Sequence, residues 1–218
     1  FNPISMLADN MEGSFNSNWN AGISPAGPAG WAFTNLQSFD GNSSMTESPS
    51  GNYTASSTRT VTCKHTFNLS DAIAANLSFW VKHRSENFRD KLQIQVATDG
   101  SNWTPICGIN TIRESNTTSG GTLGNQPALT GIREQWTHEY FDLDDFIGQP
   151  SLSFRLQFTS DNDAGSFAFE KDDGFYIDNL RLIKVSAITT LPVKFGNFTA
   201  QLMNDETVRL DWEAFIDQ

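Results

Sequence analysis

The chain has 218 residues, with 14 Lys and Arg against 25 Asp and Glu, which gives a net charge of -11. Nucleic acids and anionic membranes both attract basic surfaces, so this charge argues against both as partners. No stretch of about 20 apolar residues is available for membrane insertion. A hydrophobic content of 38%, with 17 Phe and 6 Trp, predicts a packed core and excludes a disordered chain.

The polar part of the composition indicates the cellular location of the protein. Charged residues make up only 18% of the chain, whereas Asn, Ser, Thr and Gly are abundant. We therefore expect a secreted or cell-surface protein. No signal peptide is recognisable at Phe1, so we expect a mature product or an excised piece.

Apolar and polar residues alternate with a period of two in several short runs, which is typical of strands with one buried face. In chain order, these runs cover residues 61–67, 77–81, 92–96, 152–158 and 208–212. Clusters of turn-forming residues separate them, and no segment has a convincing helical stripe. One-sided strands without helices must bury their faces against each other, so we predict an all-β protein with two stacked sheets.

Two further stretches divide the chain. Residues 111–129 contain mostly Gly, Asn, Ser and Thr, which predicts a long loop. A seam near residues 186–192 separates a first domain, residues 1–186, from residues 187–218. The second part holds two strand-like runs that would form a single hairpin, which is marginal in water. We therefore expect it to be a partial, truncated domain.

Several motifs follow one another in the order and spacing of jelly-roll domains that secreted bacterial peptidases carry. They are residues 48–53 (SPSGNY), 77–81 (LSFWV), 92–104 (LQIQVATDGSNWT) and 173–178 (DGFYID). The chain over residues 4–185 thus resembles the accessory domain of bacterial zinc carboxypeptidases. It is also similar to domains of immune-inhibitor-A peptidases and to MAM-type adhesion modules. The resemblance implies an antiparallel jelly-roll β-sandwich.

The end of the chain carries a second resemblance. Residues 191–200 (LPVKFGNFTA) and 208–212 (VRLDW) resemble the opening of a fibronectin-III-like segment. Such segments often precede the sorting domain of proteins exported by the type IX secretion route. The resemblance implies that residues 187–218 are part of a longer polypeptide.

Motifs that would make this piece an enzyme are missing. His83 and Glu86 have the spacing of a zinc carboxypeptidase pair, but the sequence around them is not that of such a site. There is no Gly-x-Ser-x-Gly motif and no Gly-rich phosphate loop. We therefore expect no catalytic residues, and we interpret the chain as a non-catalytic accessory domain of a secreted multidomain hydrolase. The expected parent is a zinc carboxypeptidase, whose other domains would be partners, and the expected role is stability, surface attachment or substrate positioning.

Calcium is the cofactor that the resemblance implies. The family's site joins the first strand to the last, and its positions correspond here to Glu12, Asp90 and Asp178. Calcium binds several oxygen ligands, and carboxylates supply them. A second place for calcium is the acidic loop of residues 161–173. The alternative for all these acids is an ordinary role in solvated turns.

A carbohydrate-binding or adhesion module of a secreted protein is the alternative function, with a polysaccharide or a protein surface as partner. Jelly rolls bind sugars by stacking aromatic rings on them. Trp80, Trp136 and Tyr53 are the candidate ligand-binding aromatics. Trp80 points away from the face shared by Phe79 and Val81, so it lies outside the core or at a sheet interface.

Cys63 and Cys107 are the two cysteines of the chain. They could form one disulfide, which would stabilise the fold by roughly 3–4 kcal/mol. They could equally be reduced thiols, since Cys is often a small core residue. The sequence leaves both possibilities open.

Overall fold

A computed structural model describes residues 2–24, 30–113, 123–162, 172–187, 193–204 and 207–216. The chain divides into two compact units, Phe1–Ser186 and Ala187–Gln218. Within the described ranges, no helix has the length and apolar character needed to cross a membrane. The two helices found there are the single-turn α1 (Phe15–Asn18) and the 3-10 turn η1 (Asp144–Phe146).

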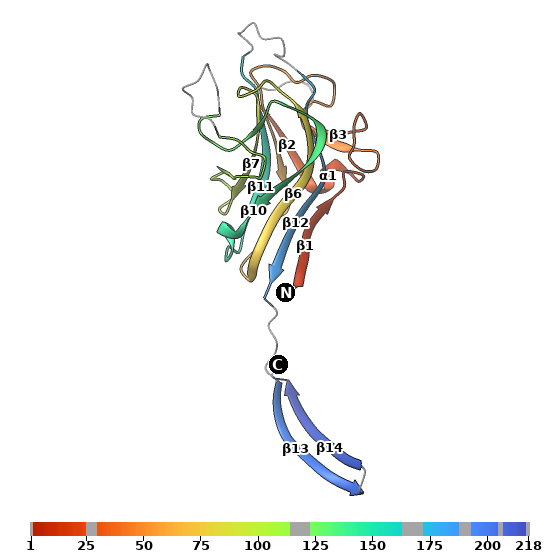
Figure 1. The fold of residues 1–218 in the computed structure, drawn as a ribbon. Helices are drawn as coiled ribbons and strands as arrows, with labels where there is room; N and C mark the ends of the chain where they lie inside the picture. The colour runs from red at the N-terminus through yellow and green to blue at the C-terminus, as the bar shows by residue number, and fades with distance from the viewer. Residues whose placement is uncertain are drawn as a thin grey trace. The chain divides into compact units, whose positions relative to one another are not determined.

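The first unit contains two sheets, called here the β6 sheet and the β11 sheet after one strand of each. In the β6 sheet, β6 (Ala72–Arg84) lies between β10 (Ile132–Asp142) and β12 (Gly174–Ser186), as Figure 1 shows. β12 is long enough to pair with β4 (Ser44–Thr46) near its start and with β1 (Asn2–Asp9) along the rest. The short β3 (Ala32–Thr34) follows β4 at the edge.

In the β11 sheet, β11 (Ser153–Thr159) lies between β5 (Thr58–Cys63) and β7 (Lys91–Ala97). The sheet is completed by β2 (Trp19–Ser24), β8 (Thr104–Pro105) and β9 (Leu129–Thr130). Every strand pair described in both sheets is antiparallel. The predicted fold class, an antiparallel jelly-roll β-sandwich, is confirmed.

The alternation read from the sequence is the alternation that builds the core. In β11, Phe154, Leu156 and Phe158 are buried while the intervening residues are half-exposed. In β6, Phe79 and Val81 are likewise buried. Burying such side chains contributes roughly 1.5–3 kcal/mol each, so the two inward faces hold the sheets together.

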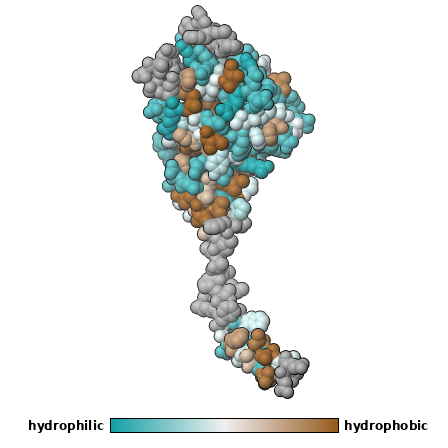
Figure 2. Space-filling view, in the orientation of Figure 1, coloured by the Kyte–Doolittle hydropathy of each residue, from teal (hydrophilic) through white to brown (hydrophobic). Residues whose placement is uncertain are grey.

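The second unit is one hairpin, in which β13 (Val193–Asn204) pairs with β14 (Thr207–Ile216). Its cross-strand pairs place apolar residues opposite each other, such as Phe198 opposite Trp212 and Leu202 opposite Val208. These side chains are exposed, and the hairpin shows brown, hydrophobic surface in Figure 2. The surface of the first unit that faces the viewer is mostly hydrophilic.

The two cysteines are not joined, and the predicted long loop is described only in part. Cys63 is buried and Cys107 is exposed, and both are reduced, so no disulfide joins them. In the predicted loop of residues 111–129, Ile112 and Ala128 form an isolated bridge. Residues 114–122 of that loop, and residues 163–171 of the acidic loop, lie outside the described residues.

Glu47 is a buried acid that ties β12 to the chain after β4. Both of its carboxylate oxygens accept a hydrogen bond from the Phe175 backbone N–H at 3.1 Å. Gly174 has a φ of +80°, and a Cβ atom there would lie 1.8 Å from Glu47 Oε1, so only glycine fits. Burial raises the pKa of Glu47 to about 8, which keeps it largely protonated at neutral pH.

We predict that Glu47 makes the stability of the fold depend on pH. Because its folded pKa lies above the ordinary value of 4.5, its stabilising effect is full below pH 4.5 and is lost as the pH rises to about 8. The loss amounts to roughly 1.4 kcal/mol per pH unit within that window. Urea unfolding at pH 5 and pH 8 should therefore show a steeper loss of stability in the native chain than in Glu47→Gln.

The other carboxyl groups are common to both proteins, so their contributions cancel in this comparison. Parallel pH dependences in the two proteins would mean that Glu47 ionises normally in the folded state.

Candidate functional site

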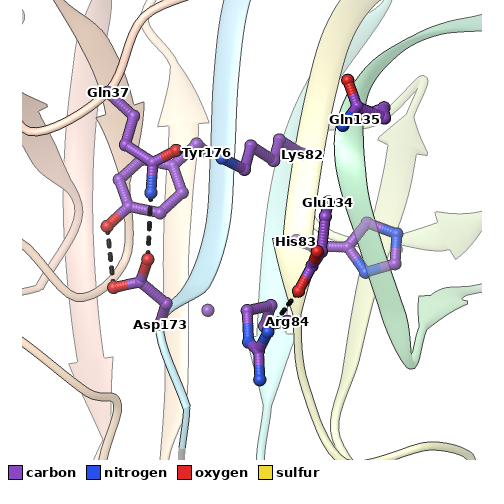
Figure 3. Close-up of a pocket in the computed structure, with 9 residues that line it drawn as sticks. Gln37, Lys82, His83, Arg84, Glu134, Gln135, Asp173 and Tyr176 are labelled. Carbon is purple, nitrogen blue, oxygen red and sulfur yellow. Dashed lines mark hydrogen bonds and ion pairs between the residues drawn. The ribbon is translucent and has the colours of Figure 1, made fainter.

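The outward face of the β6 sheet carries a pocket of about 360 Å³ (Figure 3). It opens where β6, β10 and the start of β12 meet the loop between β3 and β4. Its lining is mostly polar, from Gln37, Lys82, His83, Arg84, Glu134, Gln135, Asp173, Gly174 and Tyr176. Ligand sites are usually concave, and their polar groups fix the orientation of the ligand.

A chain of hydrogen bonds crosses one side of this pocket. The Lys82 ammonium donates to Gln37 Oε1, and Gln37 Nε2 donates to Asp173 Oδ2 at 3.0 Å. The Tyr176 hydroxyl donates to the other oxygen, Asp173 Oδ1, also at 3.0 Å (Figure 3). Burial and the neighbouring Asp173 charge raise the pKa of Tyr176, so its hydroxyl stays protonated and remains a donor.

The other charged groups of the pocket are already neutralised by partners. Arg84 Nε pairs with Asp172 at 2.9 Å, and Arg84 Nη1 pairs with Glu134. His83 points into the core, where its ring stacks on Phe175 with centroids 4.8 Å apart. Burial lowers the pKa of His83 to about 4, so it is neutral at pH 7 and serves packing.

Aromatic side chains gather beside the pocket on the same face. The rings of Phe39 and Trp80 are stacked, with centroids 3.9 Å apart and 10° between their planes. Trp136 meets Phe39 edge-on at 6.1 Å, and His138 lies 5.3 Å from Trp80. Phe39 keeps 39% of its surface exposed, so the group is accessible from solvent.

Two acids fix the loop that carries Phe39. Asp178 Oδ2 accepts hydrogen bonds from the backbone N–H groups of Phe39 at 2.8 Å and Asp40 at 3.2 Å. Asp178 is the register partner of Trp80 across β12 and β6, so it holds Phe39 above the ring on which Phe39 stacks. Glu12 Oε1 holds the end of the same loop through the N–H groups of Asn42 and Ser43, at 2.7 and 2.8 Å.

Three elements each bring one aromatic residue and one polar residue to this face. The loop supplies two residues that are two positions apart, and β6 supplies two residues that share a side. β10 supplies two neighbours, which lie where its register with β6 shifts between Arg133 and Thr137. We call this set the aromatic–polar site: Gln37 and Phe39 from the loop, Lys82 and Trp80 from β6, and Gln135 and Trp136 from β10.

The aromatics that the sequence singled out take different positions. Trp80 and Trp136 lie together in the aromatic–polar site. Tyr53, in contrast, is 1% exposed and packs on Phe158, so its ring is closed to a ligand. Sequence reasoning missed Phe39 because it lies in an irregular loop, where no periodicity reveals the direction of a side chain.

The three predicted calcium ligands do not come together. Glu12 and Asp178 share the loop described above, and burial, with a smaller contribution from the Glu12 charge, raises the pKa of Asp178. Asp90 lies in a separate cluster with Glu86 and Asp161, whose ligand oxygens are all within 4.8 Å of one another. Arg89 pairs with Glu86 and Asp161, at 3.0 Å in each case.

Comparison with known proteins adds the following findings. No model of a protein family matches the chain, and no curated protein matches it. The CBM22-1 xylan-binding domain of Paenibacillus barcinonensis Xyn10C superposes with a TM-score of 0.45 at 16% identity, over 84% of this chain and 96% of that domain. The K1 cleaved adhesin domain of Lys-gingipain from Porphyromonas gingivalis W83 gives 0.46 at 11% identity, over 84% and 98%.

A third similar structure is much longer than this chain. The glycoside hydrolase domain of Endo-D, Spr0440, from Streptococcus pneumoniae R6 superposes with a TM-score of 0.46 at 14% identity, over 91% of this chain. The match spans 27% of that structure, so the chain corresponds to about a quarter of its length. Similarities this low carry no argument about a ligand, which has to be inferred from the geometry.

We predict that calcium stabilises the folded chain and that Asp90 is its ligand. The ligand oxygens of these three carboxylates lie within 4.8 Å of one another, and oxygens bound to one calcium ion lie at separations of this size. In contrast, backbone N–H groups already donate hydrogen bonds to Glu12 and Asp178. Millimolar calcium should raise the melting temperature of the native chain and of Asp178→Asn, and leave that of Asp90→Asn unchanged.

The experiment compares each protein with itself in calcium and in chelator, so any destabilisation by the substitution itself is subtracted. If the shift disappears in Asp178→Asn instead, calcium binds between Glu12 and Asp178. No shift in the native chain would rule out calcium as its cofactor.

Proposed function

We propose that this chain is a non-catalytic accessory module of a longer secreted or cell-surface polypeptide, and that it binds carbohydrate at the aromatic–polar site. The observation that carries the proposal is the convergence of three aromatic–polar pairs from separate elements on one accessible face. A hydrolase, with a zinc carboxypeptidase as the expected parent, is the polypeptide that the sequence motifs favour.

The chemistry of the site suits a sugar. A pyranose ring presents C–H groups on its faces and hydroxyl groups around its edge. Phe39 and Trp136 offer apolar surface for the faces, and aromatic rings supply much contact area with few rotatable bonds. Gln135 and Lys82 offer hydrogen-bonding groups for the hydroxyls at the adjoining pocket.

The acids in the pocket support a binding role over a hydrolytic one. Glycoside hydrolysis needs two carboxyl groups, one to donate a proton and one to act as a base or nucleophile. Here Asp173 accepts hydrogen bonds on both oxygens, and Glu134 is paired with Arg84. Each acid is thus engaged in positioning its neighbours.

We predict that Trp136→Ala weakens binding to the glycan that the native chain recognises by about tenfold or more, because the stacking surface is lost. Trp212→Ala is the matched control, since Trp212 is an exposed tryptophan on the hairpin of the second unit. A glycan array identifies the ligand, and calorimetry measures the affinity of the three proteins.

Equal weakening by both substitutions would argue against the aromatic–polar site. Failure of the native chain to bind any glycan, together with binding to a protein surface, would replace this proposal by the adhesion function.

A further inference from the structure

We propose that the aromatic–polar site selects acidic sugars, and that Lys82 recognises their carboxylate. The inference rests on the proposed function and names its ligand class. The inference follows from one feature of the pocket: it contains a positive charge that forms no ion pair with a carboxylate of the described residues.

Lys82 is the cation concerned. Its ammonium group has three N–H donors, and its hydrogen bond in the structure is to the neutral amide oxygen of Gln37. Among the residues that the structure describes, no carboxylate forms an ion pair with it. Two donors and the full charge therefore remain for a ligand.

The neighbouring cation differs from Lys82. Arg84 is held between Asp172 and Glu134, so its charge is balanced within the protein. A ligand that bound Arg84 would have to displace one of these acids, whereas a ligand that binds Lys82 displaces none. The pocket thus has one neutralised cation and one that is free of acids.

Asp173 lies on the same side of the pocket, but other donors occupy it. Gln37 Nε2 and the Tyr176 hydroxyl donate to its two oxygens. Gln37 consequently lies between Lys82 and Asp173 and keeps the two charged groups from pairing. Figure 3 shows the Lys82 side chain reaching across the pocket toward Gln37 and Tyr176.

The rest of the site explains why the acidic ligand should be a sugar. Gln135 is exposed at the opposite side of the pocket, and its side-chain amide bonds to no residue that the structure describes. It can serve a hydroxyl while Lys82 serves the carboxylate. Trp80 and Lys82 lie on the same face of β6, about 7 Å apart. A sugar ring stacked on the aromatic residues and a carboxylate bound by Lys82 can therefore belong to one sugar unit or to two adjoining units.

The net charge of -11 repels an acidic polymer at long range. This repulsion is screened beyond about 8 Å at physiological ionic strength, whereas a contact pair in a partly desolvated pocket is screened much less. Selection for the carboxylate should therefore persist at 0.15 M salt, although low salt would slow the encounter.

The test uses the full chain and a panel of acidic oligosaccharides, each beside its methyl-esterified counterpart, which keeps the rings and removes the charge. Peptides with a free C-terminal carboxylate form a third arm. The native chain should bind an acidic oligosaccharide at least about tenfold more tightly than the ester at 0.15 M salt. Lys82→Gln should lose this preference while still binding the ester, and Lys82→Arg should retain it.

Lys64→Gln is the matched control, because Lys64 is exposed and is not one of the residues that line the pocket. Melting temperatures verify that all variants fold. Equal binding of acid and ester by the native chain would overturn the inference and leave the proposed function standing. Binding to no glycan would overturn both, and tighter binding to the peptides than to any glycan would overturn the assignment to sugars.

Discussion

The hydrogen bonds between Asp178 and the loop of residues 35–43 are the interaction on which the binding face depends. Asp178 is buried, and a buried carboxylate must be hydrogen-bonded to be tolerated. Three backbone N–H groups meet this need, two of them from the loop and one from Asn179. Because these bonds fix Phe39 over Trp80, they also place Gln37 beside Lys82.

A second buried acid fixes the other side of the same pocket. Glu47 accepts the Phe175 N–H and fits closely under Gly174, next to Asp173. The pocket is therefore framed by two carboxyl groups, those of Glu47 and Asp178, which are buried and accept hydrogen bonds from the backbone. Its shape depends on these long-range hydrogen bonds as well as on the packing of the two sheets.

Period-two alternation was sufficient to predict the fold class and some of the strands. It located β5, β6, β7, β11 and β14, and it assigned Trp80 to the side of β6 that faces away from the core. The same rule places Lys82 beside Trp80, so this signal could have revealed the charged half of the site. Strand alternation works because one face of each strand is buried, and that constraint is local in the sequence.

The rest of the site depends on contacts that the sequence does not display. Phe39 is fixed by an acid 139 positions later, and Tyr53 is buried because its hydroxyl accepts the N–H of Glu86 and its ring packs on Phe158. Asp90 lies in a different cluster from Asp178 because it directly precedes β7, a strand of the other sheet. Loop conformation and the meeting of distant acids follow from tertiary structure, which no local pattern encodes.

The claim that glycan binds at the aromatic–polar site is tested most directly by NMR. The indole N–H signals of the tryptophans are followed while a glycan that the chain binds is titrated into the protein. Trp19 and Trp31 are internal controls, because their indole N–H groups are buried and donate to Asp9 Oδ2 at 2.8 Å and to the Arg59 carbonyl at 3.0 Å. The account predicts that the signals of Trp80 and Trp136 shift at saturation while those of Trp19 and Trp31 stay in place. Saturation with glycan that leaves Trp80 and Trp136 unmoved would contradict it.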